Sequence, residues 1–372
     1  MCIVPCARVR VAVRLMDGEL AHLLRSTELG GAAGHARLEF FNVQERAAHA
    51  LLAEHPLERG VEPGATPHLA VAGIGQFGAG LVVAAAQQWA ARDAGPLTVT
   101  LIDRQAAGRL QAMRMRHPAL AATLDVRCIE LDFGAPSADA VAEFEHVLTT
   151  QPPTLVVAAF EDEGLAWTAG LFVRRRAARP VDIVVRTESE GGFGEQLSTT
   201  VAARDGWGRI IAFPFLDRAC TTDLIEGGVR EQLARALHTD HIARAGTGAA
   251  LHRDWTQLTD EERESSRAAA DAIVDQLTAI GARLVPLANW DLDRQVVTDE
   301  EIEHLAINEH TRWKAEREAA GWTHGDTRDD ALKRNPLLVE WGQLSDDAKT
   351  YNRDAARSLP ALLARAGFEV AR

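Results

Sequence analysis

Six short runs of apolar residues, separated by stretches of helical length, constrain this chain more than any other feature. They are HLAVAGI (68–74), LTVTLID (97–103), VRCIELD (126–132), TLVVAAF (154–160), VDIVVRT (181–187) and RIIAFPF (209–215). Strands that are apolar on both faces and alternate with helices are typical of a parallel sheet covered on both sides. The sequence therefore predicts a doubly wound α/β domain over residues 67–225.

The glycine-rich turn after the first of these runs indicates what such a sheet would bind. Gly73, Gly75 and Gly78 form the pattern GIGQFG, directly before a helical stretch. Glycines at these positions allow a tight turn, so that backbone N–H groups at the start of the helix reach a pyrophosphate. Because strand, turn, helix and acidic strand end follow in the right order, we predict a dinucleotide-binding Rossmann domain. The alternative is a Rossmann domain that has lost its ligand and keeps the glycines for packing.

Charged residues at the ends of the next two strands complete this predicted site. Asp103 would accept hydrogen bonds from ribose hydroxyls, although it lies 25 residues after Gly78, beyond the usual spacing of about 20. Arg104 would face an adenine or a 2′-phosphate, or be solvated, and Asp132 would reach the adenine edge or cap the next turn. The predicted cofactor-binding residues are Gly73, Gly75, Gln76, Phe77, Gly78, Asp103, Arg104 and Asp132.

The segments VAGIGQFGAGL, LID ending in Asp103 and ELD ending in Asp132 carry a resemblance to a known family. They resemble the TrkA-N (RCK) domain, the cytoplasmic nucleotide-binding regulator of potassium channels and transporters. The resemblance implies that NAD(H) or another adenine nucleotide binds as an effector, and that the chain assembles into a homo-oligomer.

Residues 1–66 predict strand, helix, strand and helix in that order. Val9, Val11 and Val13 alternate with polar or small residues, as in a half-buried strand. Two such units have too few strands for a covered parallel sheet. We therefore expect a partial α/β segment, which resembles the closing half of a preceding TrkA-N domain and implies a membrane-linked or nucleotide-binding module upstream. A loop rich in Pro and Gly over residues 58–67 marks its boundary.

Residues 226–372 are predicted to be mainly helical and carry an internal repeat. Residues 255–281 align without gaps with residues 341–367, at an offset of 86. Upstream, His238-Thr239 corresponds to His310-Thr311 at an offset of 72. The sequence therefore predicts a tandem duplication, with copies at about 233–287 and 301–372.

An ordered pattern of aromatic and charged residues runs through the second copy, from NEHTRW (308–313) to Arg353. It is similar to the ryanodine-receptor repeat (RyR) domain of calcium-release channels and bacterial proteins, and the resemblance implies adenine-nucleotide sensing. Aromatic faces beside cations would stack a base and hold a phosphate. The alternative is that these tryptophans form the core of a small helical domain. The predicted ligand-binding residues are His310, Trp313, Arg317, Trp322, Asp330, Lys333, Trp341, Asn352 and Arg353.

Composition excludes several other classes of function. The formal net charge is −13, which argues against binding of nucleic-acid polymers. Four scattered cysteines suggest no disulfide framework, and we expect a cytoplasmic protein. One candidate group of zinc ligands consists of His238 and His241 with Cys220 or His252. A structural zinc site needs four ligands, which this group does not supply, so we predict no metal site.

Together these patterns predict a non-catalytic, ligand-sensing regulatory protein linked to potassium or other ion-channel regulation, or to nucleotide signalling. A small nucleotide would be the ligand, and a membrane channel at the inner face of the membrane a candidate partner. No GxSxG, HExxH or Walker pattern is present, and we predict no catalytic residue. The alternatives are a protein-interaction scaffold with vestigial nucleotide sites and an NAD-dependent oxidoreductase, which would need a general acid or base at the nicotinamide.

Overall fold

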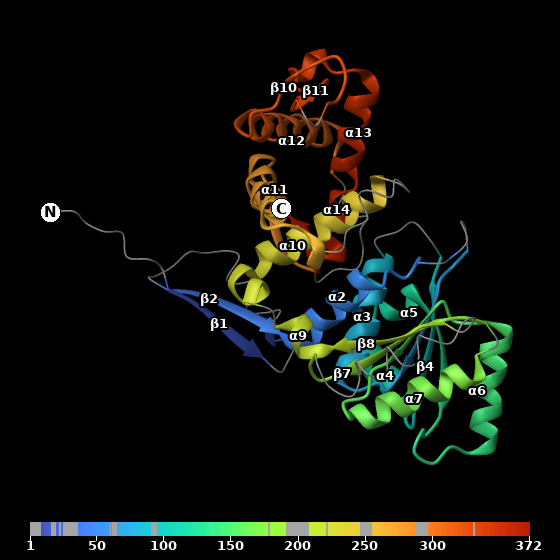
Figure 1. The fold of residues 1–372 in the computed structure, drawn as a ribbon. Coiled ribbons are helices and arrows are strands. Elements are labelled where there is room, and N and C mark those ends of the chain that lie inside the picture. Colours follow the sequence, from blue (N-terminus) through green and yellow to red (C-terminus); the bar gives the residue numbers. More distant parts are fainter. Residues whose placement is uncertain are drawn as a thin grey trace.

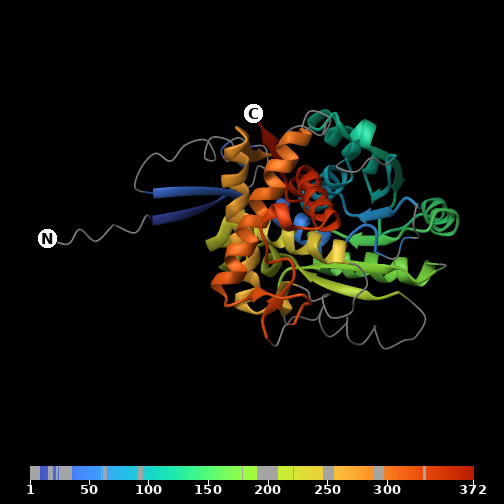
Figure 2. The same cartoon turned by 90° about the horizontal axis from the view of Figure 1, so that it is seen from above.

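The computed structural model comprises an α/β unit, a two-stranded extension near its start and a helical unit that includes the C-terminus (Figures 1 and 2). The structure describes residues 9–15, 20–21, 24, 36–59, 61, 65–90, 95–177, 179–190, 208–220, 222–245, 255–287, 297–329 and 332–372.

A six-stranded parallel sheet forms the centre of the α/β unit. Its strands are β3 (His68–Ala72), β4 (Leu97–Asp103), β5 (Leu124–Glu130), β6 (Leu155–Ala158), β7 (Asp182–Thr187) and β8 (Ile210–Pro214). The spatial order is β5-β4-β3-β6-β7-β8. The chain thus runs outward from β3 to one edge and then returns to build the other half from β6, as in Rossmann-like sheets. The predicted doubly wound α/β fold is confirmed.

Helices cover both faces of this sheet because alternate strand residues point to opposite sides. On one face, Leu69 and Val71 share a core with helices α2, α3, α4, α5 and α9. On the other, Ala70 and Ala72 share a core with α6 and α7 (Figure 1). The bounds of these helices are α2 Val43–Glu54, α3 Gln76–Ala90, α4 Ala106–Arg116, α5 Leu120–Thr123, α6 Ala138–Thr150, α7 Glu163–Arg176 and α9 Phe215–Ala219.

The first 66 residues are tied more closely to the sheet than their predicted boundary suggests. β1 (Val9–Leu15) and β2 (Ala36–Asn42) pair in parallel, apart from the six-stranded sheet. Asn42 caps α2 by accepting a hydrogen bond from the Glu45 N–H, and its Nδ2 donates to the Leu15 carbonyl. Because α2 buries Leu51 in the same core as α3, the hydrophobic core continues across residue 66. The helix predicted between the two strands lies mostly outside the described residues.

The helical unit begins with α10 (Thr222–Ala245), which is kinked at Gly228. Its further elements are η1 (Trp255–Gln257), α11 (Asp260–Ala279), β9 (Arg283–Pro286), α12 (Asp299–Ala319), β10 (Thr323–His324), β11 (Arg334–Asn335), η3 (Trp341–Gln343), α13 (Asp346–Arg357), α14 (Leu359–Arg365) and β12 (Phe368–Ala371). Thr259 and Ser345 cap the helices that follow η1 and η3. Gly281 and Gly367, at φ +71° and +80°, then allow the turns into β9 and β12, which pair antiparallel.

The helical unit contacts the α/β unit through α14, which packs on α3 (Figure 2). A Cβ atom on Gly367 would come within 3.1 Å of the His49 ring, so the turn lies close against α2. Among the described residues, no helix combines the length and the apolar character that a membrane span requires.

Candidate functional site

Two of the three predicted glycines are required by the fold itself. Gly73 has φ +89°, and a Cβ atom there would lie 2.8 Å from the Phe160 ring. A Cβ atom on Gly78 would lie 2.0 Å from the carbonyl oxygen of Gly73, so any larger residue would force α3 away from β3. These positions account for close packing of strand, turn and helix, whether or not a ligand binds.

Gly75 is different because the fold leaves room for a side chain there. The nearest atom to a Cβ built on Gly75 is Oε1 of Glu161, at 3.7 Å, and its φ is not positive. The absence of a side chain therefore leaves the backbone at the start of α3 uncovered rather than relieving a clash. We call the uncovered space beside Gly75, with Glu161 nearest to it, the opening. Gln76 is exposed beside this opening, whereas Phe77 is fully buried against Phe213 and Phe215. Of Phe77, only the backbone remains a candidate for ligand contact.

The predicted ribose acceptor, Asp103, lies beside this opening but is bonded within the protein. Its Oδ2 accepts from the Ile74 N–H at 2.8 Å. Its Oδ1 accepts from the Gln105 N–H at 3.1 Å and from Nε of Arg109 at 3.2 Å. Arg109 also donates from an Nη1 to the Ile74 carbonyl at 2.8 Å. Sequence reasoning missed Arg109; its place in the first turn of the helix after the acidic strand end is the signal that would have found it.

Arg104 and Asp132 lie further out at the same edge. Their nearest side-chain atoms are 3.9 Å apart, and both side chains are exposed. Asp132 also accepts from the Gly134 N–H at 2.8 Å, so it caps the turn after β5. The two residues predicted to meet a nucleotide are therefore close to each other, and Asp132 has a local structural role in addition.

On the other side of the opening, a buried cation ties β6 to β7. Arg186 donates to the carbonyls of Phe160 and Glu161 at 3.3 and 2.9 Å, and to the Glu188 carboxylate at 3.0 Å. Its guanidinium lies over the Phe215 ring, 4.5 Å from the centroid. Arg186 was not among the predicted site residues, because it follows three apolar strand residues and resembles an ordinary strand end.

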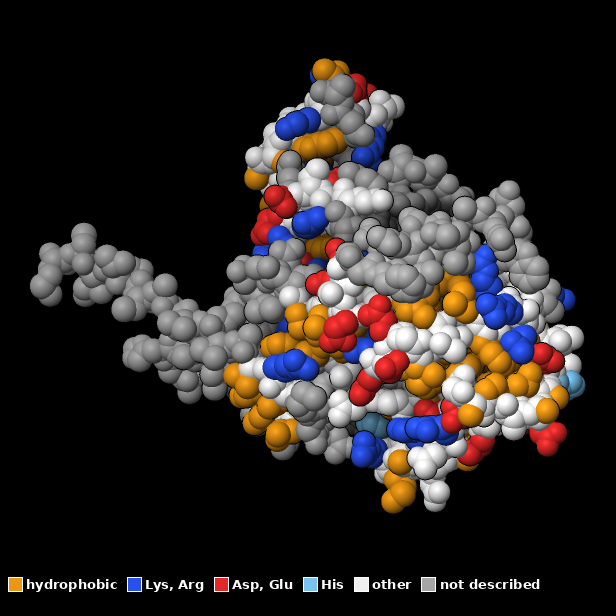
Figure 3. Space-filling model, turned by 60° about the horizontal axis from the view of Figure 1, so that its bottom comes forward, with side chains coloured by type: hydrophobic (Ala, Val, Ile, Leu, Met, Phe, Trp, Pro, Cys, Tyr) orange, Lys and Arg blue, Asp and Glu red, His pale blue; other side chains and the backbone are white. Residues whose placement is uncertain are grey.

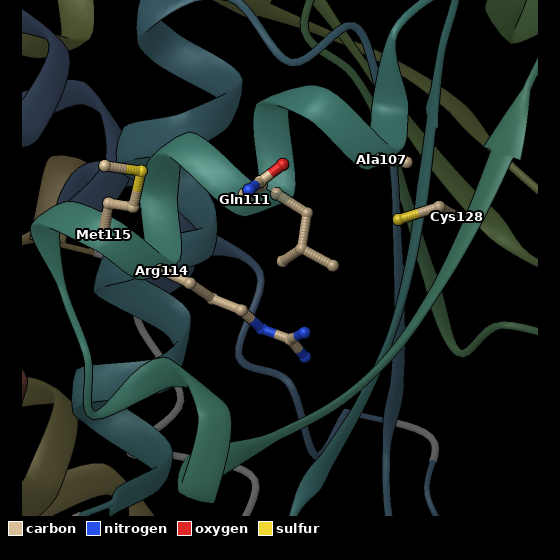
Figure 4. Close-up of a pocket in the computed structure, with 6 residues that line it drawn as sticks. Ala107, Gln111, Arg114, Met115 and Cys128 are labelled. Atoms are coloured by element: carbon tan, nitrogen blue, oxygen red, sulfur yellow. The ribbon is translucent and has the colours of Figure 1, made fainter.

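A hollow of about 420 Å³ lies elsewhere on α4, and it is separate from the glycine turn. Figure 4 shows its lining of Ala107, Leu110, Gln111, Arg114, Met115 and Cys128. Burial raises the pKa of the Cys128 thiol, so this cysteine is not an activated nucleophile. The hollow is wide open and mostly apolar, and Arg109 is not part of its lining.

In the helical unit, four side chains form what we call the outer cluster: Glu303, His310, Trp341 and Arg353. The Glu303 carboxylate accepts from Nε of Arg353 at 2.5 Å and from Nε1 of Trp341 at 3.2 Å. The Arg353 hydrogen bond lowers the pKa of the Glu303 carboxyl. The His310 ring lies 5.9 Å from that of Trp341, and its Nε2 is 2.9 Å from the Val339 carbonyl oxygen.

A second group, the inner cluster, contains the same kinds of side chain with one arginine more: Glu231, Arg235, His238, Trp255 and Arg267. The Glu231 carboxylate accepts from Nε of Arg267 at 2.7 Å and from Nε1 of Trp255 at 3.1 Å. Arg235 adds a further contact at 3.3 Å. The carboxylates at the centre of both clusters were missed by sequence reasoning, which followed the aromatic and basic residues alone.

The remaining predicted residues of the second copy lie apart from the outer cluster or at its margin. Trp313 packs 5.9 Å from the His310 ring, and Arg317 stacks over Trp322 at 5.4 Å. Nζ of Lys333 donates to the Ala320 carbonyl at the end of α12, and Lys333 has a positive φ of 51°. Asn352 donates back to Ala348 within α13. Asp330 lies outside the described residues.

Other features bear on the predicted partners. In the part of the chain that the structure describes, no three His, Cys, Asp or Glu side chains come together as a metal site. On the face shown in Figure 3, basic and acidic side chains are interspersed and do not form one basic stripe.

Comparison with known proteins finds a family similarity for one part of the chain. A family model described as the RyR domain matches residues 287–372. This C-terminal part resembles the RyR domain. The match confirms the resemblance expected for residues 301–372 and extends it back to residue 287, directly after β9. The matched residues include the whole outer cluster.

Among solved structures, the chain is similar to a protein of Thermotoga maritima provisionally described as an alcohol dehydrogenase. The sequence identity is 15%, and the TM-score is 0.28. The similarity covers 56% of this chain and 50% of that chain, so the present chain spans half the length of that protein.

Proposed function

We propose that this chain is a ligand-sensing regulatory protein whose α/β unit binds an adenine nucleotide at the glycine turn. The open position at Gly75 supports this most directly. It lies between β3 and β6, where the strand order reverses, the place where open α/β sheets bind their ligands. A glycine that the fold does not need, at the start of a helix, leaves backbone N–H groups accessible to a pyrophosphate.

NAD(H) or a related adenine nucleotide fits the residues around this opening. The backbone of Gly75, Gln76 and Phe77 would hold the phosphates, and the adenosine would lie toward Asp103 and Asp132. We infer an effector and not a substrate, because the chain joins this unit to an RyR-containing helical unit. This reading accords with the resemblance of GIGQFG, LID and ELD to the TrkA-N domain.

The helical unit is, in this proposal, a tandem pair of RyR repeats. The inner and outer clusters support the duplication, because Glu231 and Glu303 are related by the offset of 72, and Trp255 and Trp341 by the offset of 86. The paired strands add to this: Leu284 faces Val370, its counterpart at the offset of 86. The pair would relay the nucleotide signal to a second copy of the chain or to a membrane channel at the inner face of the membrane.

Calorimetric titration of the full chain with NAD+, NADH, ATP and ADP-ribose tests the nucleotide site. We expect at least one of them to bind, and Gly75→Val to abolish that binding by filling the opening. Gly95→Val is the matched control, because a Cβ atom at the exposed Gly95 meets nothing within 4 Å. Thermal midpoints of both variants equal to that of the wild type would show that neither disturbs the fold.

If no nucleotide binds to the folded wild-type chain, the sensing function is wrong and the interaction scaffold becomes the better account. If a nucleotide binds and Gly75→Val does not weaken it, the ligand lies elsewhere. Turnover of NAD+ with any small alcohol or aldehyde would instead favour an oxidoreductase.

A further inference from the structure

The two sides of the opening carry different charges. Toward β4 and β5, the guanidinium groups of Arg104 and Arg109 are each paired with one carboxylate, that of Asp132 or Asp103. Toward β6 and β7, the carboxylates of Glu161, Glu163 and Glu188 are exposed or half-buried, while the cation among them, Arg186, is buried and already bonded. A ligand with unequal charge at its two ends would therefore place its more anionic end toward β4 and β5.

Asp103 has little capacity left to accept hydrogen bonds from an unmodified ribose. A carboxylate offers about four acceptor positions. Three are used by the Ile74 N–H, the Gln105 N–H and Nε of Arg109. The Asp103 side chain is only 10% exposed, so it cannot turn outward without breaking these bonds. The residue that would normally bind a ribose diol is occupied inside the protein.

Arg109, in contrast to Asp103, has hydrogen-bonding capacity left for a ligand. Nε and one Nη are held by Asp103 and the Ile74 carbonyl, which fixes the plane of the guanidinium. The other Nη has no partner among the described residues, and the side chain is 44% exposed. A guanidinium fixed in this way presents its remaining N–H groups to a planar or tetrahedral anion at little further entropic cost. Arg104, 76% exposed and 3.9 Å from the Asp132 carboxylate, supplies a second cation at the same edge.

We propose that Arg109, assisted by Arg104, makes this site selective for an adenine nucleotide that carries a phosphate on its 2′-hydroxyl. This proposal rests on the nucleotide-binding function above and specifies its ligand class. An arginine beside the ribose position accommodates a 2′-phosphate in Rossmann sites. Here the charge of Asp103, which would repel such a phosphate, is balanced by Arg109 itself and by the Ile74 N–H.

Matched pairs of nucleotides test the selectivity on the full chain. NADP+ is compared with NAD+, and adenosine 2′,5′-bisphosphate with 5′-AMP, by calorimetry. In the wild type we expect the 2′-phosphorylated member of each pair to bind about tenfold more tightly or better. Arg109→Gln should reduce this ratio to near one, and Arg109→Lys should leave an intermediate ratio because it keeps the charge but loses the planar fork.

Arg114→Gln is the control, because Arg114 is on the same helix but lines the separate hollow. It should leave the ratio unchanged. Since Arg109 also anchors the glycine turn, its loss could weaken all nucleotides; such weakening would affect both members of a pair equally and leave their ratio intact.

Three results overturn the proposal in distinguishable ways. Equal affinity within each pair, or tighter binding of NAD+, would refute the selectivity but keep the nucleotide site. A ratio that survives Arg109→Gln would refute the role of Arg109. Failure of all four nucleotides to bind would remove the proposed function as well.

Discussion

The inner cluster and the outer cluster join the same kinds of side chain in two different environments. In the inner cluster, Glu231 is 1% exposed and is bonded to two arginines and a tryptophan. In the outer cluster, Glu303 and Arg353 are 38% and 36% exposed, and the carboxylate is paired with this one arginine. The geometry of the Trp–Glu–Arg contact is nearly the same in both, so burial is the main difference between them.

This difference determines what each cluster contributes to stability. A buried carboxylate has lost its water and depends on every donor around it, so removing one partner leaves an uncompensated charge. A half-exposed pair recovers hydrogen bonds from water and contributes little net free energy. The inner cluster is thus expected to hold the helical unit together, while the outer cluster can change without unfolding it.

The largest predicted difference in the free energy of unfolding is between variants that remove the carboxylate charge of one cluster or of the other. Glu231→Gln should lower the free energy of unfolding by about 3–5 kcal/mol, because the partly buried Arg235 and Arg267 then lose the buried carboxylate that they share. The matched Glu303→Gln should cost less than about 1 kcal/mol. Chemical denaturation of both variants measures the difference. Equal costs would mean that burial does not distinguish the clusters.

Acid should act first on the α/β unit and only later on the outer cluster. Burial lowers the pKa of His55 to about 4, so the folded protein binds this proton less readily than the unfolded chain does. The free energy of unfolding should therefore fall as the pH is lowered from about 6.5 to 4, by about 3 kcal/mol in total. Glu303, whose pKa is lowered by Arg353, loses its smaller contribution only as the pH falls through that lowered value.

Denaturation curves at a series of pH values test this order. His55→Phe should flatten the dependence between pH 6.5 and 4, whereas the same change at the exposed His146 should not alter it. An unchanged slope in His55→Phe would assign the acid sensitivity to another group.

The smallest predicted effect concerns the indole N–H groups. Trp255→Phe keeps an aromatic ring but removes the donor to Glu231, and it should cost about 1–3 kcal/mol because the carboxylate is buried. Trp341→Phe should cost less, since water can replace the donor at Glu303. Unfolding midpoints of the two variants measure the difference, and a larger loss at Trp341 would contradict it.

The sheet was predictable from the sequence because its strands are buried on both faces and carry a continuous apolar signal. Each predicted strand begins and ends within two residues of the observed one. The glycine turn was predictable because backbone conformation and close packing require glycine at Gly73 and Gly78. In both cases the requirement is local, so it leaves a local trace in the sequence.

Contacts between distant segments left no such trace. Glu231 meets Trp255 across a gap of 24 residues, and Glu303 meets Trp341 across 38. Arg109 reaches Ile74 only because the sheet brings β3 and β4 side by side. Phe77 was predicted to bind the cofactor because of its place in the GIGQFG motif. Its side chain belongs to the hydrophobic core and is not available to a ligand. His241 and His252, from the zinc set that was considered and rejected, have no described side chains.

Helix α3 connects the glycine turn with the helical unit, two parts of the molecule that lie far apart in the sequence. Its first residue, Gln76, is at the glycine turn, and its body packs on α14 of the helical unit. A helix of fifteen residues is a stiff rod about 22 Å long. A ligand that shifts α3 at the glycine turn would therefore also displace α14, because the rigid helix transmits the motion. The influence is mutual: whatever binds the helical unit also changes the cost of occupying the turn.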